Sequence, residues 1–284
     1  MANTISTHSY REKFAKGRFD YLLRRSLISE AICNVDTTDN KTIKNPYIST
    51  GGATGQALTG TYSVGNVTTT DDDLVVTKEF IEGGHVMDWE EVLTEHSLFQ
   101  GAIDQMTFNV KNEMDKWVLN SLCDDAGSSY STPSGGFASG NVATIFSNIN
   151  STLAGYAEAY RGMYVVLENT DLPGIIATQV ASGFSYADSA LNNGLIGNYM
   201  GVDIYVTRTG TFVDATVAGD TFTNANNRVA GVKGASTFAH PRGIGYQEKA
   251  VSGKTGMELV VYGYTGFKQW ATTANLTIDI TLTA

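Results

Sequence analysis

The sequence has few cysteines and contains no long hydrophobic run. Two cysteines in 284 residues, Cys33 and Cys123, cannot form a disulfide framework, so we expect free, buried thiols in a reducing compartment. The N-terminus lacks the apolar stretch of a signal peptide, and no apolar run is long enough to span a bilayer. These absences predict a protein that is made and folded in a cytoplasm and has no membrane partner.

The sequence also lacks the residue patterns that most catalytic and metal-binding sites require. Its four histidines are scattered, and no serine lies in a G-x-S-x-G turn. Gly51–Gly55 is rich in glycine but lacks the strand, the helix and the Lys-Thr pair of a phosphate-binding loop. The run Asp71-Asp72-Asp73 lacks the spaced ligands of a calcium loop, so a solvated strand entry is the simpler interpretation. We predict no enzyme activity, no cofactor and no metal site.

Proline is scarce and glycine is abundant, with 4 and 30 residues respectively. This balance is typical of short elements joined by many turns. Hydrophobic residues make up 42% of the chain and aromatic residues 10%, which excludes a disordered protein. The length allows one large or two modest domains with a sizeable core.

Charge is unevenly distributed along the chain. The formal net charge of −10 argues against a general nucleic-acid binder. Residues 1–30 nevertheless carry six basic and three acidic side chains, whereas residues 43–96 carry two basic and nine acidic ones. The basic start and the acidic stretch could meet across a subunit boundary, although two solvated faces are the simpler explanation.

The first half of the sequence predicts an arm, a projecting loop and a long helix. Tyr10–Val35 is predicted as an amphipathic, interrupted helix. Lys44–Thr70, rich in glycine and threonine, predicts a projecting two-stranded loop with its tip near Gly51–Gly60; a disordered linker is the alternative. Leu74–Asp88 alternates like a strand and is predicted to turn at Gly83-Gly84. Ser97–Ala126 carries apolar residues at steps of three and four, which predicts a helix of roughly 45 Å.

The second half predicts a linker, a compact α/β segment and a closing run of strands. Gly127–Gly140 is predicted as a linker at a domain boundary. Helices are expected at Thr144–Tyr160 and Ala181–Leu191, and a polar loop at Asp214–Arg228. Strands are expected at Tyr164–Leu167, Val202–Val206, Gly234–Ala239, Gly243–Gln247, Met257–Tyr264 and Leu276–Leu282.

Three local patterns, in this order, resemble one protein family. They are Val75–Lys78 with the acidic Val86–Glu91, the glycine-flanked Ile196–Val206, and Tyr262-Gly263-Tyr264 before a β-rich tail. With the order of the parts, they resemble the major capsid (coat) proteins of tailed bacteriophages, which have the Hong Kong ninety-seven-like fold. The resemblance implies an α+β chain with four parts. These are an N-terminal arm (1–42), an extended β loop (43–82), a peripheral domain around the spine helix (83–137 and 267–284) and an axial α/β domain (138–266).

The resemblance also implies a function and partners. It implies pentamers and hexamers of this chain in an icosahedral shell, assembled in a bacterial cytoplasm around double-stranded DNA. Portal, decoration or separate scaffold proteins would be its partners, because the arm is short for a built-in scaffold. The candidate subunit-contact residues are Arg24, Arg25, Gly51, Gly52, Gly55, Tyr62, Asp71, Asp72, Asp73, Lys78 and Glu79. An encapsulin-type compartment, a phage tail or adhesin protein, and a hydrolase with an unrecognised acidic site remain alternatives.

Overall fold

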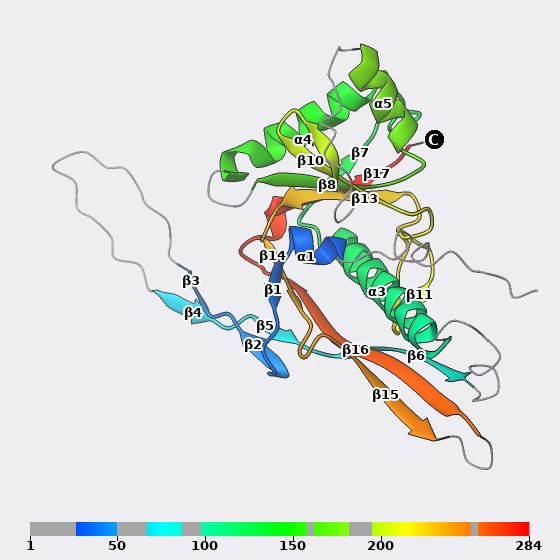
Figure 1. The fold of residues 1–284 in the computed structure, drawn as a ribbon. Coiled ribbons are helices and arrows are strands. Elements are labelled where there is room, and N and C mark those ends of the chain that lie inside the picture. The colour runs from blue at the N-terminus through cyan, green and yellow to red at the C-terminus, as the bar shows by residue number, and fades with distance from the viewer. Residues whose placement is uncertain are drawn as a thin grey trace, which may run out of the picture.

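The computed structural model describes residues 27–49, 67–86, 98–157, 162–181, 195–250 and 255–283. In these residues a long helix, α3, lies between two β-sheets, and a narrow ribbon projects to one side (Figure 1). One continuous core joins the helix to both sheets, because Val118 and Leu122 of the helix are buried in the same cluster as Phe80 of one sheet and Val166 of the other.

The spine helix predicted at Ser97–Ala126 is confirmed as α3, Leu98–Asp124. Its 27 residues give a length of about 40 Å at 1.5 Å per residue. Met114 and Trp117 face one sheet, and Leu119 and Leu122 are fully buried on the other side. The helix therefore contributes buried side chains to a core that it shares with both sheets.

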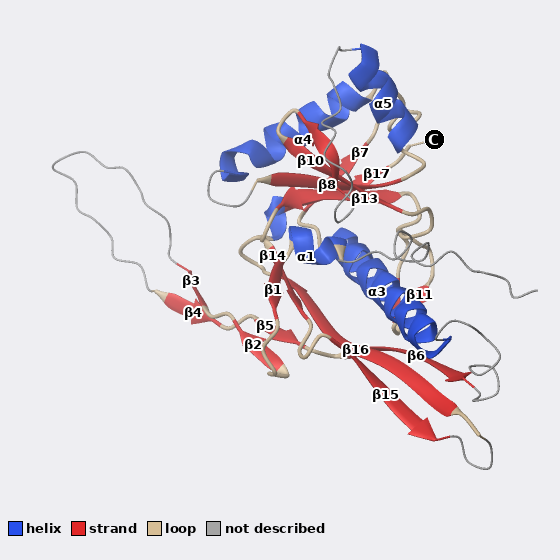
Figure 2. Ribbon diagram, viewed as in Figure 1, coloured by secondary structure: helices blue, strands red, loops and turns tan. Residues whose placement is uncertain are grey.

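A six-stranded sheet covers one side of α3 (Figure 2). Its strand order is β7-β17-β13-β8-β10-β9, with β8 and β10 parallel and β17 and β7 parallel. Helices α4 (Val142–Ala157) and α5 (Leu172–Ala181) lie beyond its other face. Every residue of β8 is buried, as expected for a central strand covered on both faces. The strands are β7 (Ser128–Ser131), β8 (Met163–Glu168), β9 (Leu195–Tyr199), β10 (Val202–Thr207), β13 (Asn227–Val232) and β17 (Thr277–Thr281).

A five-stranded sheet covers the opposite side of α3. Its long strand β16 pairs with β14 near one end and is flanked by β15 and β6 near the other. Gly263 in β16 lets the helix approach closely, because a Cβ there would lie 3.2 Å from the Met114 sulfur. The strands are β1 (Asn34–Asp36), β6 (Lys78–Val86), β14 (Ser236–Ala239), β15 (Ile244–Ala250) and β16 (Met257–Gln269).

The projecting loop predicted at Lys44–Thr70 is a two-stranded antiparallel ribbon in the described residues. Strand β2 (Thr42–Lys44) pairs with β5 (Asp73–Val75), and β3 (Tyr47–Ser49) pairs with β4 (Thr68–Thr70). Leu74 anchors the base of the ribbon in a small core with Ala239 and Trp270. The predicted tip at Gly51–Gly60 lies outside the described residues.

Three short elements complete the described structure. Helix α1 (Ile28–Ile32) packs against α3. The hairpin of β11 (Thr216–Val217) and β12 (Asp220–Thr221) also contacts α3. A 3-10 turn, Ala274–Leu276, leads into β17. The predicted free thiols are confirmed, because Cys33 and Cys123 are both buried and unpaired.

The structure corrects two predictions in the first half of the chain. The helix expected to reach Val35 ends at Ile32, and Asn34–Asp36 forms β1 instead. The strand expected to turn at Gly83-Gly84 runs straight through both glycines as part of β6. Gly84 lies under the Met106 side chain of α3 rather than in a turn, and a Cβ there would displace the terminal methyl group of Met106.

The sheets group strands from separate parts of the chain. The C-terminal strand, expected beside the spine helix in 267–284, is β17; it contacts α3 and is the second strand of the six-stranded sheet. Strands β14, β15 and most of β16, expected in the axial stretch 138–266, belong to the other sheet with β6. The linker predicted at Gly127–Gly140 contains β7, and the loop predicted at Asp214–Arg228 contains a hairpin. Helix α5 was not predicted, and most of the helix predicted at Ala181–Leu191 lies outside the described residues.

Candidate assembly surfaces

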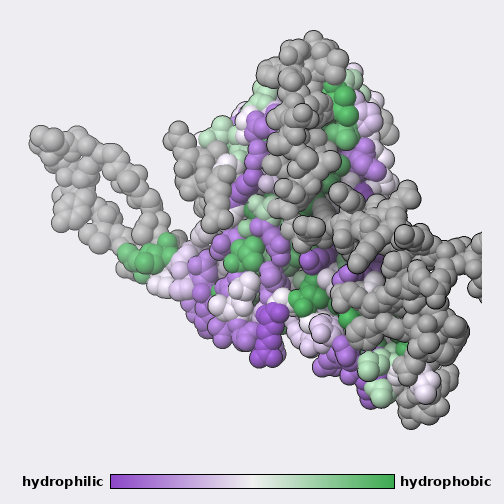
Figure 3. All heavy atoms as spheres, in the orientation of Figure 1, coloured by the Kyte–Doolittle hydropathy of each residue, from purple (hydrophilic) through white to green (hydrophobic). Residues whose placement is uncertain are grey.

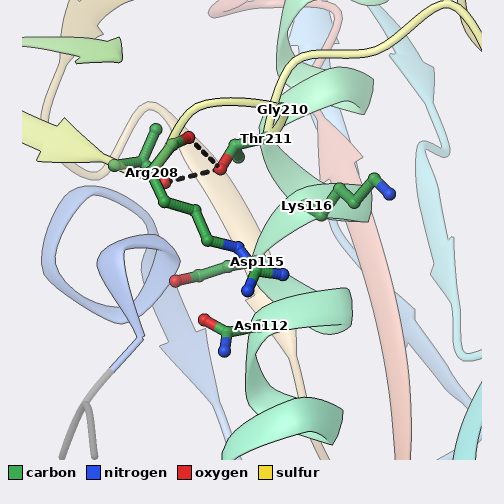
Figure 4. Close-up of a pocket in the computed structure, with 7 residues that line it drawn as sticks. Asn112, Asp115, Lys116, Arg208, Gly210 and Thr211 are labelled. Atoms are coloured by element: carbon green, nitrogen blue, oxygen red, sulfur yellow. Dashed lines mark hydrogen bonds between the residues drawn. The ribbon is translucent and has the colours of Figure 1, made fainter. Parts of the chain in front are cut away.

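The described residues form a polar crevice beside α3. Its polar side chains connect neighbouring elements of the fold. Figure 4 shows Asp115 and Asn112 of the helix facing Arg208. The two Asp115 oxygens accept hydrogen bonds from the Ile28 N–H (2.9 Å), the Ser29 N–H (3.0 Å) and the Ser29 hydroxyl (2.6 Å). The carboxylate is therefore used to fasten α1 onto α3.

A second polar joint ties the six-stranded sheet to its loops. Arg228 at the start of β13 is buried, and its Nε lies 2.5 Å from Asp171 while a terminal nitrogen lies 3.3 Å from Glu168. The other Glu168 oxygen accepts the N–H groups of Gly210, Thr211 and Phe212 at 3.0–3.2 Å. Buried charges are stable only when paired and hydrogen-bonded in this way, so the cluster fixes the loop that faces α3.

The outer part of the ribbon exposes apolar side chains. Ile48 in β3 is 66% exposed, and Val67, just before β4, is 65% exposed. Figure 3 shows hydrophobic atoms gathered at this part of the ribbon. A two-stranded ribbon is marginally stable alone, and exposed apolar side chains on it favour a partner surface. The ribbon is therefore the first candidate assembly surface.

The outer face of the β6-β16-β15 sheet is the second candidate surface. Phe80 of β6 points toward α3 and is buried, whereas the next residue, Ile81, is 63% exposed. Ile81 lies opposite Tyr262, and Tyr264 lies opposite Glu79. The Tyr262 and Tyr264 rings are 5.7 Å apart, and the Glu79 carboxylate raises the pKa of the Tyr264 hydroxyl. This face thus combines aromatic, aliphatic and acidic groups in one row.

Several predicted contact residues have partners within their own chain. Asp72 accepts a hydrogen bond from the Ala271 N–H and lies 3.1 Å from the Lys268 ammonium. Burial alone would raise the pKa of Asp72, but these two donors lower it below its ordinary value. Asp72, a predicted subunit-contact residue, thus holds the base of the ribbon within its own chain.

Lys78 is also engaged within the chain. Its ammonium lies 2.7 Å from Asp220 and 3.0 Å from the Ala218 carbonyl. Burial would raise the pKa of Asp220, but hydrogen bonds from Lys78 and from the Trp117 indole lower it. Lys78 thus joins β6 to the β11–β12 hairpin.

The remaining predicted contact residues fall into two groups. Asp71, Asp73 and Glu79 are exposed in the described part of the chain. Arg24, Arg25, Gly51, Gly52, Gly55 and Tyr62 lie outside the described residues. The prediction missed Ile48, Val67 and Ile81, although the alternation Phe80-Ile81 on a strand already placed one apolar residue on each face.

Two general features of the described residues bear on the kind of site. No helix among them is long and apolar enough to cross a membrane. Within the same residues, no three His, Cys, Asp or Glu side chains converge as metal ligands.

The fold is similar to that of solved phage capsid structures. It matches the capsid of cyanophage P-SCSP1u with a TM-score of 0.68 and 12% identity, covering 96% of this chain and 92% of that one. It matches the mature capsid of bacteriophage PhiM1 with a TM-score of 0.68 and 10% identity, covering 96% and 91%. It matches the capsid of an empty GTA (gene transfer agent) particle with a TM-score of 0.63 and 12% identity, covering 92% and 91%.

Neither a family model nor a curated protein sequence matches the chain. The identities to the solved structures are so low that the likeness is one of fold. It extends over more than nine-tenths of both chains. The mixed α+β fold of a phage capsid protein is thereby established for this chain.

Proposed function

We propose that this chain is a major capsid protein that assembles into an icosahedral shell enclosing double-stranded DNA. The observation that carries the proposal is the match of its entire fold to phage capsid structures, with more than nine-tenths of each chain covered. A structural rather than catalytic role follows from that likeness. The protein would reside in the virion after assembly in the bacterial cytoplasm, with no membrane partner.

The surfaces described above support assembly through many modest contacts. The ribbon exposes Ile48 and Val67, and its two pairs of three-residue strands need a surface to lie on. We infer that the ribbon lies across a neighbouring subunit, that residues 1–26 reach another one, and that pentamers and hexamers form around the six-stranded domain. Contacts of this kind add up to a lattice although each is small.

We further propose a division into domains that follows the observed sheets. The axial domain comprises the six-stranded sheet with α4 and α5, and the peripheral domain comprises α3 with β6, β14, β15 and β16. The net charge of −10 would weakly repel packaged DNA and so limit adhesion during packaging. Portal, scaffold or decoration proteins are further partners under this proposal.

Electron microscopy with analytical ultracentrifugation tests the proposed function. We expect closed polyhedral shells, or rings of five and six subunits, from the purified chain or after co-expression with its neighbouring genes. A chain that remains monomeric under both conditions would overturn the proposal. The contents of nuclease-treated particles separate a virus from an encapsulin-type compartment, because protected DNA supports the virus whereas a protein cargo supports the compartment.

A further inference from the structure

A groove lies between strand β6, helix α3 and the β11–β12 hairpin. Its volume is about 500 Å³, and its apolar walls include Phe80, Ile81, Val110 and Val217. Three acidic residues line it as well: Glu82 of β6 and Glu113 of α3, and at its edge Glu79, whose carboxylate lies toward Tyr264 on the outer face of the sheet. The groove therefore offers both an apolar floor and a negatively charged rim.

The negative charge of the groove is not balanced by the described residues that line it. None of these residues is a lysine or an arginine. Glu82 is held by the neutral Asn109 amide at 3.0 Å, and the Lys116 ammonium lies 3.8 Å from Glu113 at the edge. The nearest cation on β6, Lys78, is already paired with Asp220. A ligand with several positive charges and a few apolar side chains would complement this surface.

One segment of this chain has that composition. Residues 11–25 carry six basic side chains and two acidic ones, with Phe14 and Leu22 among them. The segment precedes Leu27, which is buried next to α1. It lies outside the described residues, so its charge and length are known from the sequence alone.

The position of α1 indicates which copy supplies the segment. Asp115 fastens α1 to α3, and Glu113 lines the groove; at 100° per residue these two positions lie about 200° apart on the helix. Lys116 lies between these two positions on the helix surface. Arg208 lines the same crevice as Asp115 (Figure 4). The start of α1 and the groove thus lie on opposite sides of α3, which favours a segment supplied by a second copy.

We propose that the acidic groove binds the basic segment 11–25 of a second copy of this chain. The inference rests on the proposed shell function, because it assigns one of the contacts between neighbouring subunits. Among the described residues, Lys116 is the cation paired with a groove carboxylate, at 3.8 Å from Glu113.

Charge reversal in the groove tests the contribution of the contact. We expect Glu82→Lys to raise about tenfold the protein concentration at which half of the chains are assembled. A tenfold change corresponds to about 1.4 kcal/mol of association free energy. The matched control Glu248→Lys makes the same charge change on the exposed strand β15 and should leave that concentration within twofold. Equal effects of the two substitutions would overturn the proposal, because the groove would then have no special role.

Cross-linking between copies identifies the occupant. Chains with Glu82→Cys are assembled together with chains in which Lys13, Lys16, Arg18 or Arg24 is replaced by Cys in turn, and the particles are then oxidised. Because Cys33 and Cys123 are buried, they give little background. We expect a covalent dimer of the two different chains for at least one pair. Particles that form normally without this dimer would overturn the inference and leave the shell function intact, whereas absence of particles from the unmodified chain would refute the shell function itself.

Discussion

Two carboxylates meet where the end of α3 approaches β17. Burial and the nearby Asp124 carboxylate together raise the pKa of Asp279 to about 6, against the opposing effect of hydrogen bonds from Cys123 and Asn227. The folded state therefore favours the protonated form of Asp279. Stability from this group is present below the ordinary pKa near 4 and is lost as the pH rises through about 6.

Asp279→Asn is expected to remove this pH dependence. A rise of about two pKa units corresponds to roughly 3 kcal/mol, and the half-exposed position reduces this to about 1 kcal/mol through solvent screening. The variant should be more stable than the parent at pH 8 by that amount and equal to it near pH 4. Urea unfolding at pH values from 4 to 8 measures the difference, and parallel stability curves for the two proteins would contradict the explanation.

At the scale of elements, the joint between α1 and α3 depends on one side chain. Asp115 is 1% exposed and accepts two backbone N–H groups and one hydroxyl from the start of α1. A short helix of five residues has little stability of its own, so its position depends on this anchor and on the burial of Ile28 and Ile32.

Asp115→Asn should loosen α1 from the spine helix. The amide keeps one acceptor oxygen but loses the charge and a second acceptor, so we expect the free energy of unfolding to fall by about 2–3 kcal/mol. Hydrogen exchange should show faster exchange at Ile28 and Ser29 than in the parent protein. Asp214→Asn, which changes a single exposed acceptor for the Ala225 N–H, serves as the control. Unchanged exchange at α1 would show that apolar packing alone holds it.

Local patterns in the sequence predicted elements better than they predicted sheet membership. The stripe of α3 and the apolar run of β8 identified both elements, because a helix face and a buried strand each have a local period. The prediction of a turn at Gly83-Gly84 was wrong because the sequence does not distinguish a glycine in a turn from a glycine in a strand that a helix approaches closely. The contact of Gly84 with Met106 of α3 is visible only in the structure. The ion cluster around Arg228 joins residues up to 60 positions apart, which no local pattern reveals.

At the scale of the whole molecule, the order of the parts indicated the fold, whereas the membership of each strand in a sheet could not be predicted from that order. The chain crosses between its two sheets more than once: β13 lies in one sheet, β14 to β16 lie in the other, and β17 returns to the first. Sheet membership therefore does not follow consecutive stretches of the chain, and the predicted domain boundaries stay a prediction. The candidate contact residues illustrate the same limit, because Asp72 and Lys78 are charged residues of the kind that usually faces solvent, yet they pair with residues 140 to 199 positions away.

The ribbon allows folding and assembly to be separated in one experiment. Ile48 and Val67 are about two-thirds exposed, so Ile48→Asp with Val67→Asp should change the free energy of unfolding by no more than about 0.5 kcal/mol per site. In a shell these side chains would be covered by a neighbour, and burying two carboxylates without partners there is strongly unfavourable. We therefore expect a folded subunit that no longer forms particles.

The matched control is Ile176→Asp, which places the same charge on the exposed side of α5. Thermal unfolding reports the fold of each variant, and sedimentation velocity reports its assembly. If the ribbon lies across a neighbouring subunit, the ribbon variant sediments as a folded monomer or small oligomer while the parent forms particles. Particles of normal size and yield from the ribbon variant would mean that these side chains remain in solvent after assembly, and the ribbon would then have to contribute through its backbone or through its tip.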